Sequence, residues 1–202
     1  MKSHALCLLP LFHIFVCSVL AQGTLVYDQQ STSGNTGESA ANLVTAQQLG
    51  QSFTPTLSAI DFVTLQLGDG NSINGIGASI FISIFSGSLT NGTLLGSTTP
   101  LLLPNGFGQT ESGFTNFFFQ TTIPLTPGAT YYLRPILQTG DSSFFVTANT
   151  FNYSGGTAFY QGSPLASVDL AFREGIVSVP EPGALALAAL GTLLLGCRRW
   201  KK

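Results

Sequence analysis

The residues with the clearest capacity for chemistry are two oxygen-bearing side chains on either side of a glycine. Asp69 and Asn71 flank Gly70, and carboxylate and amide oxygens spaced around a tight turn are the ligands that calcium prefers. The further acids of a complete calcium loop are missing, so an ordinary turn is the alternative interpretation. We therefore expect no cofactor other than a calcium ion held by Asp69 and Asn71.

A second kind of chemistry would come from aromatic rings close to glycines. Tyr153 and Tyr160 lie on either side of Gly155 and Gly156. An exposed aromatic ring offers a large contact area for stacking on a sugar at a modest entropic cost. Packing in a hydrophobic core is the alternative for both rings. These two tyrosines are the candidates for a sugar-binding site.

The composition of the central part of the chain excludes several classes of site. All cysteines and histidines lie in the terminal segments, at positions 4, 7, 13, 17 and 197, so residues 22–179 contain neither. A disulfide framework, a zinc site built from Cys or His, a thiol nucleophile and a histidine-dependent triad are therefore excluded there.

Acidic residues far outnumber basic ones in this central part. Arg134 and Arg173 are its only basic residues, against eight acidic ones, which gives a net charge of −6. Proteins that bind nucleic acid neutralise phosphates with clustered Lys and Arg, so no nucleic-acid partner is expected. A glycan hydrolase needs two carboxylates about 5 to 10 Å apart, and scattered acids such as Asp61 and Asp69 give no sign of such a pair. We therefore expect that the protein is not an enzyme.

The first 21 residues have the three parts of a secretory signal peptide. Lys2 supplies a basic region, residues 5–20 are mostly apolar, and Ala21 precedes a cleavage point before Gln22. The apolar run is too short for a stable membrane anchor. The chain is predicted to be exported, with residues 1–21 removed.

Residues 176–202 are predicted to form a sorting and anchor segment. Pro180, Glu181 and Pro182 resist both helix and sheet, because proline lacks an amide donor and restricts the residue before it. The uncharged apolar stretch 183–196 is predicted to be a helix about 21 Å long, short of the roughly 30 Å core of a membrane. Four basic residues after it would hold this end in the cytoplasm: Arg198, Arg199, Lys201 and Lys202. The segment is predicted to be a transient membrane anchor.

This tail resembles the PEP-CTERM sorting signal of Gram-negative bacteria that make extracellular polysaccharide. The resemblance rests on the triplet 180–182, the apolar helix and the Arg198–Arg199 cluster, in that order. It implies a processing partner, an exosortase, which is a membrane-embedded transpeptidase similar to cysteine proteases, and cleavage near the triplet. It also implies tethering to the inner membrane before processing and a place at the cell surface or in the extracellular matrix afterwards. An ordinary tail anchor that follows prolines is the alternative.

Between these segments, residues 22–175 have the composition of strands and turns. Val63, Leu65 and Leu67 alternate with polar residues, and isoleucines recur at every second position of 79–86, which is typical of β-strands. Turn-forming residues recur every eight to fifteen residues or so, without amphipathic helices between the strands. We predict about nine short strands in an all-β, antiparallel two-sheet β-sandwich that is jelly-roll-like. A short helical turn is expected at 40–49.

Four stretches of this central part resemble the choice-of-anchor family of bacterial surface domains, and type R in particular. They are 50–55, 126–133, 155–160 and 169–173. The resemblance implies an exported β-sandwich that occurs with different sorting tails and has no established activity.

Three functions follow from these patterns. The first is an exported structural or adhesive protein of the cell surface or the extracellular polysaccharide, sorted by an exosortase. The alternative is a carbohydrate-binding module whose aromatic site includes Tyr153 and Tyr160. The third is a calcium-assisted enzyme that acts on glycans, which is disfavoured because residues 22–179 contain no Lys and no His to serve as a base.

Overall fold

The computed structural model describes residues 23–32, 39–46, 48–109, 113–150, 153–166 and 168–179. One compact unit spans Thr24–Ser178. These ranges contain strands and turns without any helix, so no helix there could cross a membrane. The predicted signal peptide 1–21 lies outside the described residues, as do the triplet 180–182 and the predicted apolar helix 183–196.

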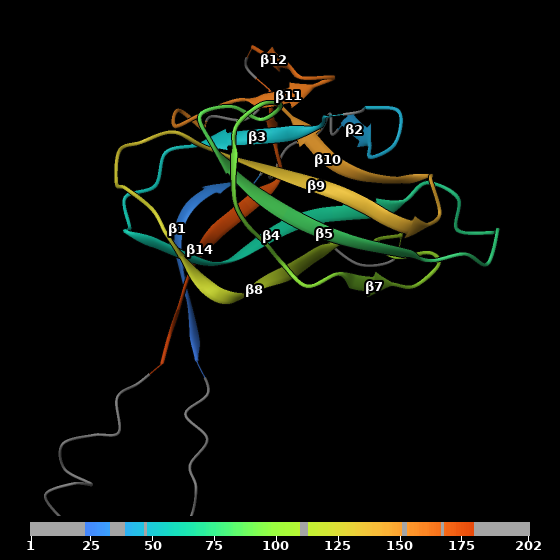
Figure 1. Cartoon of the computed structure of the whole chain (residues 1–202). Helices are drawn as coiled ribbons and strands as arrows, with labels where there is room; N and C mark the ends of the chain where they lie inside the picture. Colours follow the sequence, from blue (N-terminus) through green and yellow to red (C-terminus); the bar gives the residue numbers. More distant parts are fainter. Residues whose placement is uncertain are drawn as a thin grey trace, which may run out of the picture. The chain divides into compact units, whose positions relative to one another are not determined.

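The described strands form two antiparallel sheets. Their bounds are β1 Thr24–Ser31, β2 Ser39–Asn42, β3 Gly50–Phe53, β4 Ala59–Asp69, β5 Ala78–Ser86, β6 Thr93–Ser97, β7 Leu101–Leu103, β8 Phe114–Pro124, β9 Tyr131–Gly140, β10 Phe144–Asn149, β11 Ala158–Tyr160, β12 Ser163–Leu165, β13 Asp169–Leu170 and β14 Phe172–Ser178. The first sheet has the order β1-β14-β4-β10-β13, with β2 beside β10 and β8 beside β4. The second has the order β12-β11-β3-β9-β5-β6, with β7 beside β5. The sheets pack face to face (Figure 1), so the predicted β-sandwich is confirmed.

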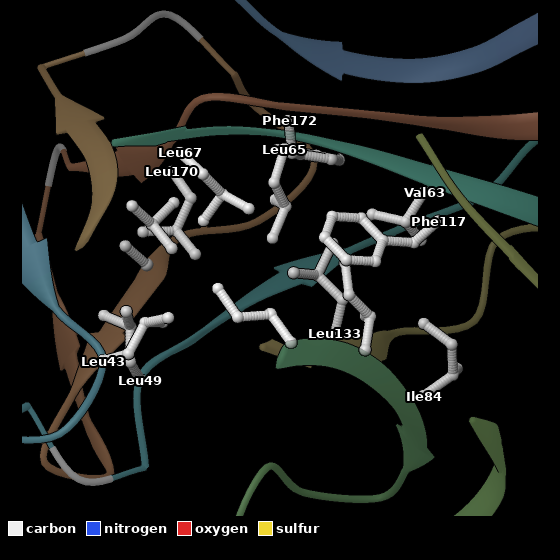
Figure 2. Close-up of a cluster of buried hydrophobic side chains, with 14 of the residues drawn as sticks. Leu43, Leu49, Val63, Leu65, Leu67, Ile84, Phe117, Leu133, Leu170 and Phe172 are labelled. Atoms are coloured by element: carbon white, nitrogen blue, oxygen red, sulfur yellow. The ribbon is translucent and has the colours of Figure 1, made fainter. Parts of the chain in front are cut away.

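The hydrophobic core lies between the two sheets and follows the predicted alternation. Val63 and Leu65 of β4 face inward and are fully buried, as are the three isoleucines of β5. Figure 2 shows Val63 and Phe117 from the first sheet gathered with Leu133 and Ile84 from the second. Burying an aliphatic or aromatic side chain of this size stabilises a fold by about 1.5 to 3 kcal/mol. The facing rows of β4 and β5 therefore hold the two sheets together.

The prediction of a helical turn at 40–49 is wrong for residues 40–42, which belong to strand β2. β2 pairs with β10, so residues 39–42 are extended. A single turn follows, in which the amide of Ala46 donates to the Asn42 carbonyl at 3.0 Å. The Asn42 Oδ1 atom accepts the amide hydrogens of Val44 and Thr45, each at 2.9 Å. Pairing with the available edge of β10 thus outweighs the local helical preference of this alanine-containing segment.

Two aspartates lie where strand pairing is irregular, and they connect neighbouring segments. Asp28 is the extra residue of a β-bulge in β1, and Asp61 of β4 lies opposite the longer stretch 119–122 of β8. The Asp28 carboxylate accepts the amide hydrogens of Thr56 and Leu57 at 2.7 and 2.9 Å, and Asp61 accepts that of Val177 at 2.8 Å. Burial alone would raise the pKa of Asp28, but the hydrogen bonds it accepts hold that pKa below its usual value.

The first and last strands of the sandwich, β1 and β14, lie side by side. Thr24, the first residue of β1, pairs with Ser178, the last residue of β14. Figure 1 shows these two strands running together to one end of the sandwich. Every strand pair of the described ranges lies between these two residues. A cut in the chain after Ser178 therefore breaks none of these pairs.

Candidate functional site

The two candidate tyrosines lie in different surroundings. Tyr153 is half-buried, its ring meets that of Phe172 edge-on with the centroids 5.2 Å apart, and its hydroxyl accepts the Thr54 amide hydrogen at 3.1 Å. Burial raises the pKa of Tyr153 to about 12. Tyr160, at the end of β11, is 37 % exposed. Only Tyr160 thus offers much of its ring to solvent, and a sugar-binding role for either residue stays a prediction.

The candidate calcium residues form part of a network between loops. Asp69 is fully buried, and its Oδ1 atom accepts the Asn71 amide hydrogen at 2.8 Å and the Ser143 hydroxyl at 3.0 Å. Its Oδ2 atom accepts the Gly106 amide hydrogen at 2.7 Å. Asn71 itself is exposed. The described ranges contain no group of three or more His, Cys, Asp or Glu that could hold a metal ion. Asp69 joins three loops in this way, and calcium binding stays a prediction.

Two further acids lie inside the sandwich, on β13 and β14. Asp169 is almost fully buried and accepts a hydrogen bond from the Gln51 amide nitrogen at 2.8 Å. Glu174 is fully buried, and neither of its carboxylate oxygens has a hydrogen-bond partner. Burial raises the pKa of both acids, and the charge of Asp28 adds to the effect on Glu174, whose pKa reaches about 8. Neither carboxyl group reaches the surface, so they cannot flank a substrate there.

The outer face of the first sheet carries an aromatic row that the sequence patterns did not single out. Tyr27, Gly175, Phe62 and Phe118 lie opposite one another on β1, β14, β4 and β8. The ring of Phe62 meets that of Tyr27 edge-on at a centroid distance of 5.6 Å and that of Phe118 at 6.1 Å. Phe62 is fully buried, whereas Tyr27 is 43 % and Phe118 45 % exposed. Two exposed rings therefore rest on a buried third ring.

Gly175 brings the rings of this row into contact across β14. A Cβ atom at this position would lie 2.0 Å from the carbonyl oxygen of Val26, which no side chain can tolerate. With no side chain on β14 at this point, Tyr27 reaches Phe62 directly. Aromatic cover of a glycine is a known way of stabilising a sheet.

A polar row runs beside the aromatic one across the same four strands. It consists of Gln30, Arg173, Thr64 and Asn116. The guanidinium carbon of Arg173 lies 5.4 Å from the ring centroid of Tyr27 and 4.8 Å from that of Phe114. We call the two rows together with Phe114 the aromatic–arginine face.

The hydrogen-bonding capacity of this face is largely unused. Arg173 makes no ion pair with any residue of the described ranges, and its Nε atom is buried without a hydrogen-bond partner. The Thr64 hydroxyl donates to the Asn116 side-chain oxygen at 2.5 Å. The amide nitrogen of Asn116 makes no hydrogen bond to the described residues. The face thus combines exposed rings, one cation and an amide donor.

The signal for this face is present in the sequence but incomplete. Phe62 and Phe118 each stand next to an inward residue, Val63 and Phe117, so alternation alone places them outward. That they meet Tyr27 and Arg173 depends on the order and register of four strands, which alternation does not give.

A separate groove of about 320 Å³ lies on the second sheet. It is lined by residues 43–44 and 48–49 and by the β9 residues 134–137. Six of its eight lining residues are apolar, and Arg134 is the one basic residue among them. The two arginines of the central part therefore lie at different places, one in this groove and one on the aromatic–arginine face.

Comparison with known proteins concerns the end of the chain. A family model described as the PEP-CTERM protein-sorting motif matches residues 178–202. A search of curated proteins gives no match. The predicted PEP-CTERM tail is thus confirmed, and the match begins at the last residue of β14. The motif indicates a protein that an exosortase, a membrane enzyme, sorts to the cell surface.

Proposed function

We propose that the protein is an exported structural or adhesive component that stays with extracellular polysaccharide after an exosortase has processed its tail. The observation that carries the proposal is the position of the sorting motif, residues 178–202, directly after a sandwich that ends at Ser178. Before processing, the tail tethers the protein to the inner membrane. Afterwards the sandwich is the part that remains at the surface or in the matrix.

The pairing of the two end strands suits a domain that is cut next to its last strand. Cleavage near Pro180–Pro182 falls outside the ladder that joins β1 to β14. The processed domain therefore keeps all the strand pairs of the described ranges. The resemblance to choice-of-anchor domains of type R, which occur with different sorting tails, supports the same division into sandwich and tail.

The arrangement of the acids supports a role without catalysis. Hydrolysis of a glycan needs two accessible carboxylates on either side of the bond that is cut. All five aspartates of the described ranges accept hydrogen bonds from other protein groups, and Glu174 is buried. These five are Asp28, Asp61, Asp69, Asp141 and Asp169. Their contacts hold loops and bulges in place.

A carbohydrate-binding module is the second candidate function. The observation that favours it is the aromatic–arginine face, whose exposed rings and free donors are the groups that hold sugars in proteins. The two functions are compatible, because a surface protein that binds the matrix is retained by it.

Retention of the protein by the matrix is the first test. In cells that make extracellular polysaccharide, the processed protein is expected in the cell-surface and matrix fractions. In a strain that lacks the polysaccharide, we expect most of it in the medium, because nothing holds it after cleavage. Immunoblots of the three fractions measure this.

The possible outcomes separate the two parts of the proposal. Equal retention in both strains would contradict association with polysaccharide and leave sorting intact. Protein that stays in the inner membrane of both strains would contradict sorting itself.

A further inference from the structure

We propose that the aromatic–arginine face binds an acidic polysaccharide, with Tyr27 and Phe118 against the sugar rings and Arg173 paired with a sugar carboxylate. The inference rests on the proposed function, since it names the ligand that would hold the processed protein in the matrix. It assigns the binding to β1, β14, β4 and β8, away from Tyr153 and Tyr160.

The geometry of the rings fits a sugar chain. Tyr27 and Phe118 come from strands on either side of the pair β14 and β4, and the buried ring of Phe62 supports both from between. Rings fixed in this way lose little freedom when a ligand covers them. Their exposed surfaces can contact the C–H groups of a pyranose.

The polar row supplies what the rings lack. The guanidinium of Arg173 is held over Tyr27 and Phe114, so its direction is set before a ligand arrives. A planar guanidinium matches a carboxylate with two parallel hydrogen bonds. The free amide of Asn116, in the same row, is a donor to a sugar hydroxyl. Together these groups define a ligand with both hydroxyls and negative charge.

The charge of the face distinguishes it from the rest of the domain. Residues 22–179 carry a net charge of −6, which repels an acidic polymer over most of the surface. Arg173 has no acidic partner among the described residues. By register, the nearest acids on the two neighbouring strands are Asp28 of β1 and Asp61 of β4. The carboxylate of Asp28 accepts the amide hydrogens of Thr56 and Leu57, and that of Asp61 accepts hydrogen bonds from Thr122 and Val177, at 2.6 and 2.8 Å. The unpaired cation thus selects where an anionic chain can bind.

Other partners fit this face less well. The exposed apolar groups of the two rows are Tyr27 and Phe118, whereas a stable protein interface buries roughly 800 Å² on each partner. Nucleic acid would need several cations along its phosphates, and the face has one. A polysaccharide with one carboxylate per sugar unit fits this face, because Arg173 can bind a carboxylate while Tyr27 and Phe118 contact the sugar rings.

Calorimetric titration of the full-length chain tests the proposal directly. The chain is purified in a non-ionic detergent without a sugar headgroup, and the probes are polygalacturonate, neutral dextran and polyuridylate. We expect binding of polygalacturonate, weakened about tenfold in Tyr27→Ala and in Arg173→Gln. Raising the salt concentration weakens the wild-type binding and leaves that of Arg173→Gln nearly unchanged, because the screened ion pair is already absent.

Matched variants keep the test independent of folding. Arg134→Gln removes the other arginine of the domain and is expected to bind as the wild type does. Tyr160→Ala tests the other candidate ring: unchanged binding supports the aromatic–arginine face, and a loss as large as that of Tyr27→Ala would contradict it. Tyr27→Phe keeps the ring and is expected to retain binding. Thermal unfolding of each variant, followed by circular dichroism, checks that the sandwich is intact.

The results that overturn the proposal are distinct from those that overturn the proposed function. Equal affinity for dextran and polygalacturonate, stronger binding of polyuridylate, or equal losses in Arg134→Gln and Arg173→Gln would each contradict it. If polygalacturonate does not bind but the protein is still released from cells that lack polysaccharide, retention has another basis and the face is not the site.

Discussion

Replacing Glu174 by glutamine will stabilise the folded domain at about pH 9 by several kcal/mol and will change its stability little at about pH 4. Glu174 is fully buried, and both its carboxylate oxygens lack hydrogen-bond partners. A charge in such a place is costly, because burial removes its hydration, and the nearby backbone amide of Gln29 offsets only part of this effect on the pKa. Glutamine has almost the same shape and carries no charge.

The direction of the pH dependence follows from the pKa of Glu174. Burial, with a smaller contribution from the charge of Asp28, raises this pKa from 4.5 in the unfolded chain to about 8 in the folded one. Between these values the folded state binds more protons than the unfolded state, so the free energy of unfolding falls as the pH rises. At about 1.4 kcal/mol per pKa unit, the loss is complete above pH 8 and amounts to about 5 kcal/mol. The glutamine variant does not suffer this loss.

Urea denaturation of the full-length chain in detergent, at several pH values from 4 to 9, measures the effect. A smaller slope remains in the variant, because the pKa of Asp169 is also raised by burial. Asp141→Asn is the control of opposite sign, since hydrogen bonds from Ser143 and Asn74 lower the pKa of Asp141 and its charge stabilises the fold. Parallel pH profiles for the wild type and Glu174→Gln would contradict the assigned burial of Glu174.

Replacing Pro180, Glu181 and Pro182 together by alanine will abolish processing of the tail. Proline lacks an amide donor and disfavours a helical conformation of the residue before it, so the sequence of the triplet predicts a peptide that is open to cleavage. Alanine is the strongest helix former and removes both restrictions. We expect the variant to remain in the inner membrane at its unprocessed size, with the surface fraction reduced to background.

Cell fractionation and immunoblotting compare this variant with the wild type. Pro164→Ala, which removes an exposed proline of β12 within the sandwich, is the matched control and is expected to be sorted normally. Identical surface distribution and identical processing of the triple variant and the wild type would contradict a sorting role for the triplet.

The strands of the core could be predicted because the signal for each is local. Val63, Leu65 and Leu67 alternate with other residues within a single strand, and all three are buried. The residues 125–128, which include Pro127 and Gly128, predict a turn in the same way, and the structure places it one residue later, at 126–129. Gly128 has a φ of +79°, and the Ala129 amide donates to the Thr126 carbonyl at 3.1 Å. Period-two patterns and turn residues need no knowledge of the partner strand.

The features that were missed depend on pairing between distant strands. β2 is extended because β10 offers an edge for pairing, and nothing in 39–42 itself requires this. The aromatic–arginine face needs four strands in register, from residue 27 to residue 175. A bulge such as that at Asp28 shifts the register by one residue, which reverses the faces on either side of it.

The burial of Glu174 is a different case, since its signal was available. Phe172 and Glu174 are two residues apart on β14 and therefore share a face, and Phe172 lies in the core. Placing an unpaired acid beside a core phenylalanine runs against the usual cost of burying charge. The raised pKa resolves this conflict, because the acid is mostly neutral at pH 7.

The sorting motif was predictable for the opposite reason to the aromatic–arginine face. A sorting signal that an enzyme recognises as a peptide is contained in consecutive residues, here the triplet, the apolar run and the basic cluster. The match to residues 178–202 needs no tertiary structure. Roles for Tyr153, Tyr160, Asp69 and Asn71 would depend on what surrounds each side chain, which consecutive residues do not specify.

The intact mass of the mature protein, isolated from cells with and without their exosortase, is the most direct measurement. With the enzyme present, we expect a chain that lacks the apolar segment 183–196 and the basic residues beyond it. Without the enzyme, we expect the same chain with its tail retained and located in the inner membrane. A mature protein that carries the complete tail in both strains, or loses it equally in both, would contradict exosortase sorting of this β-sandwich.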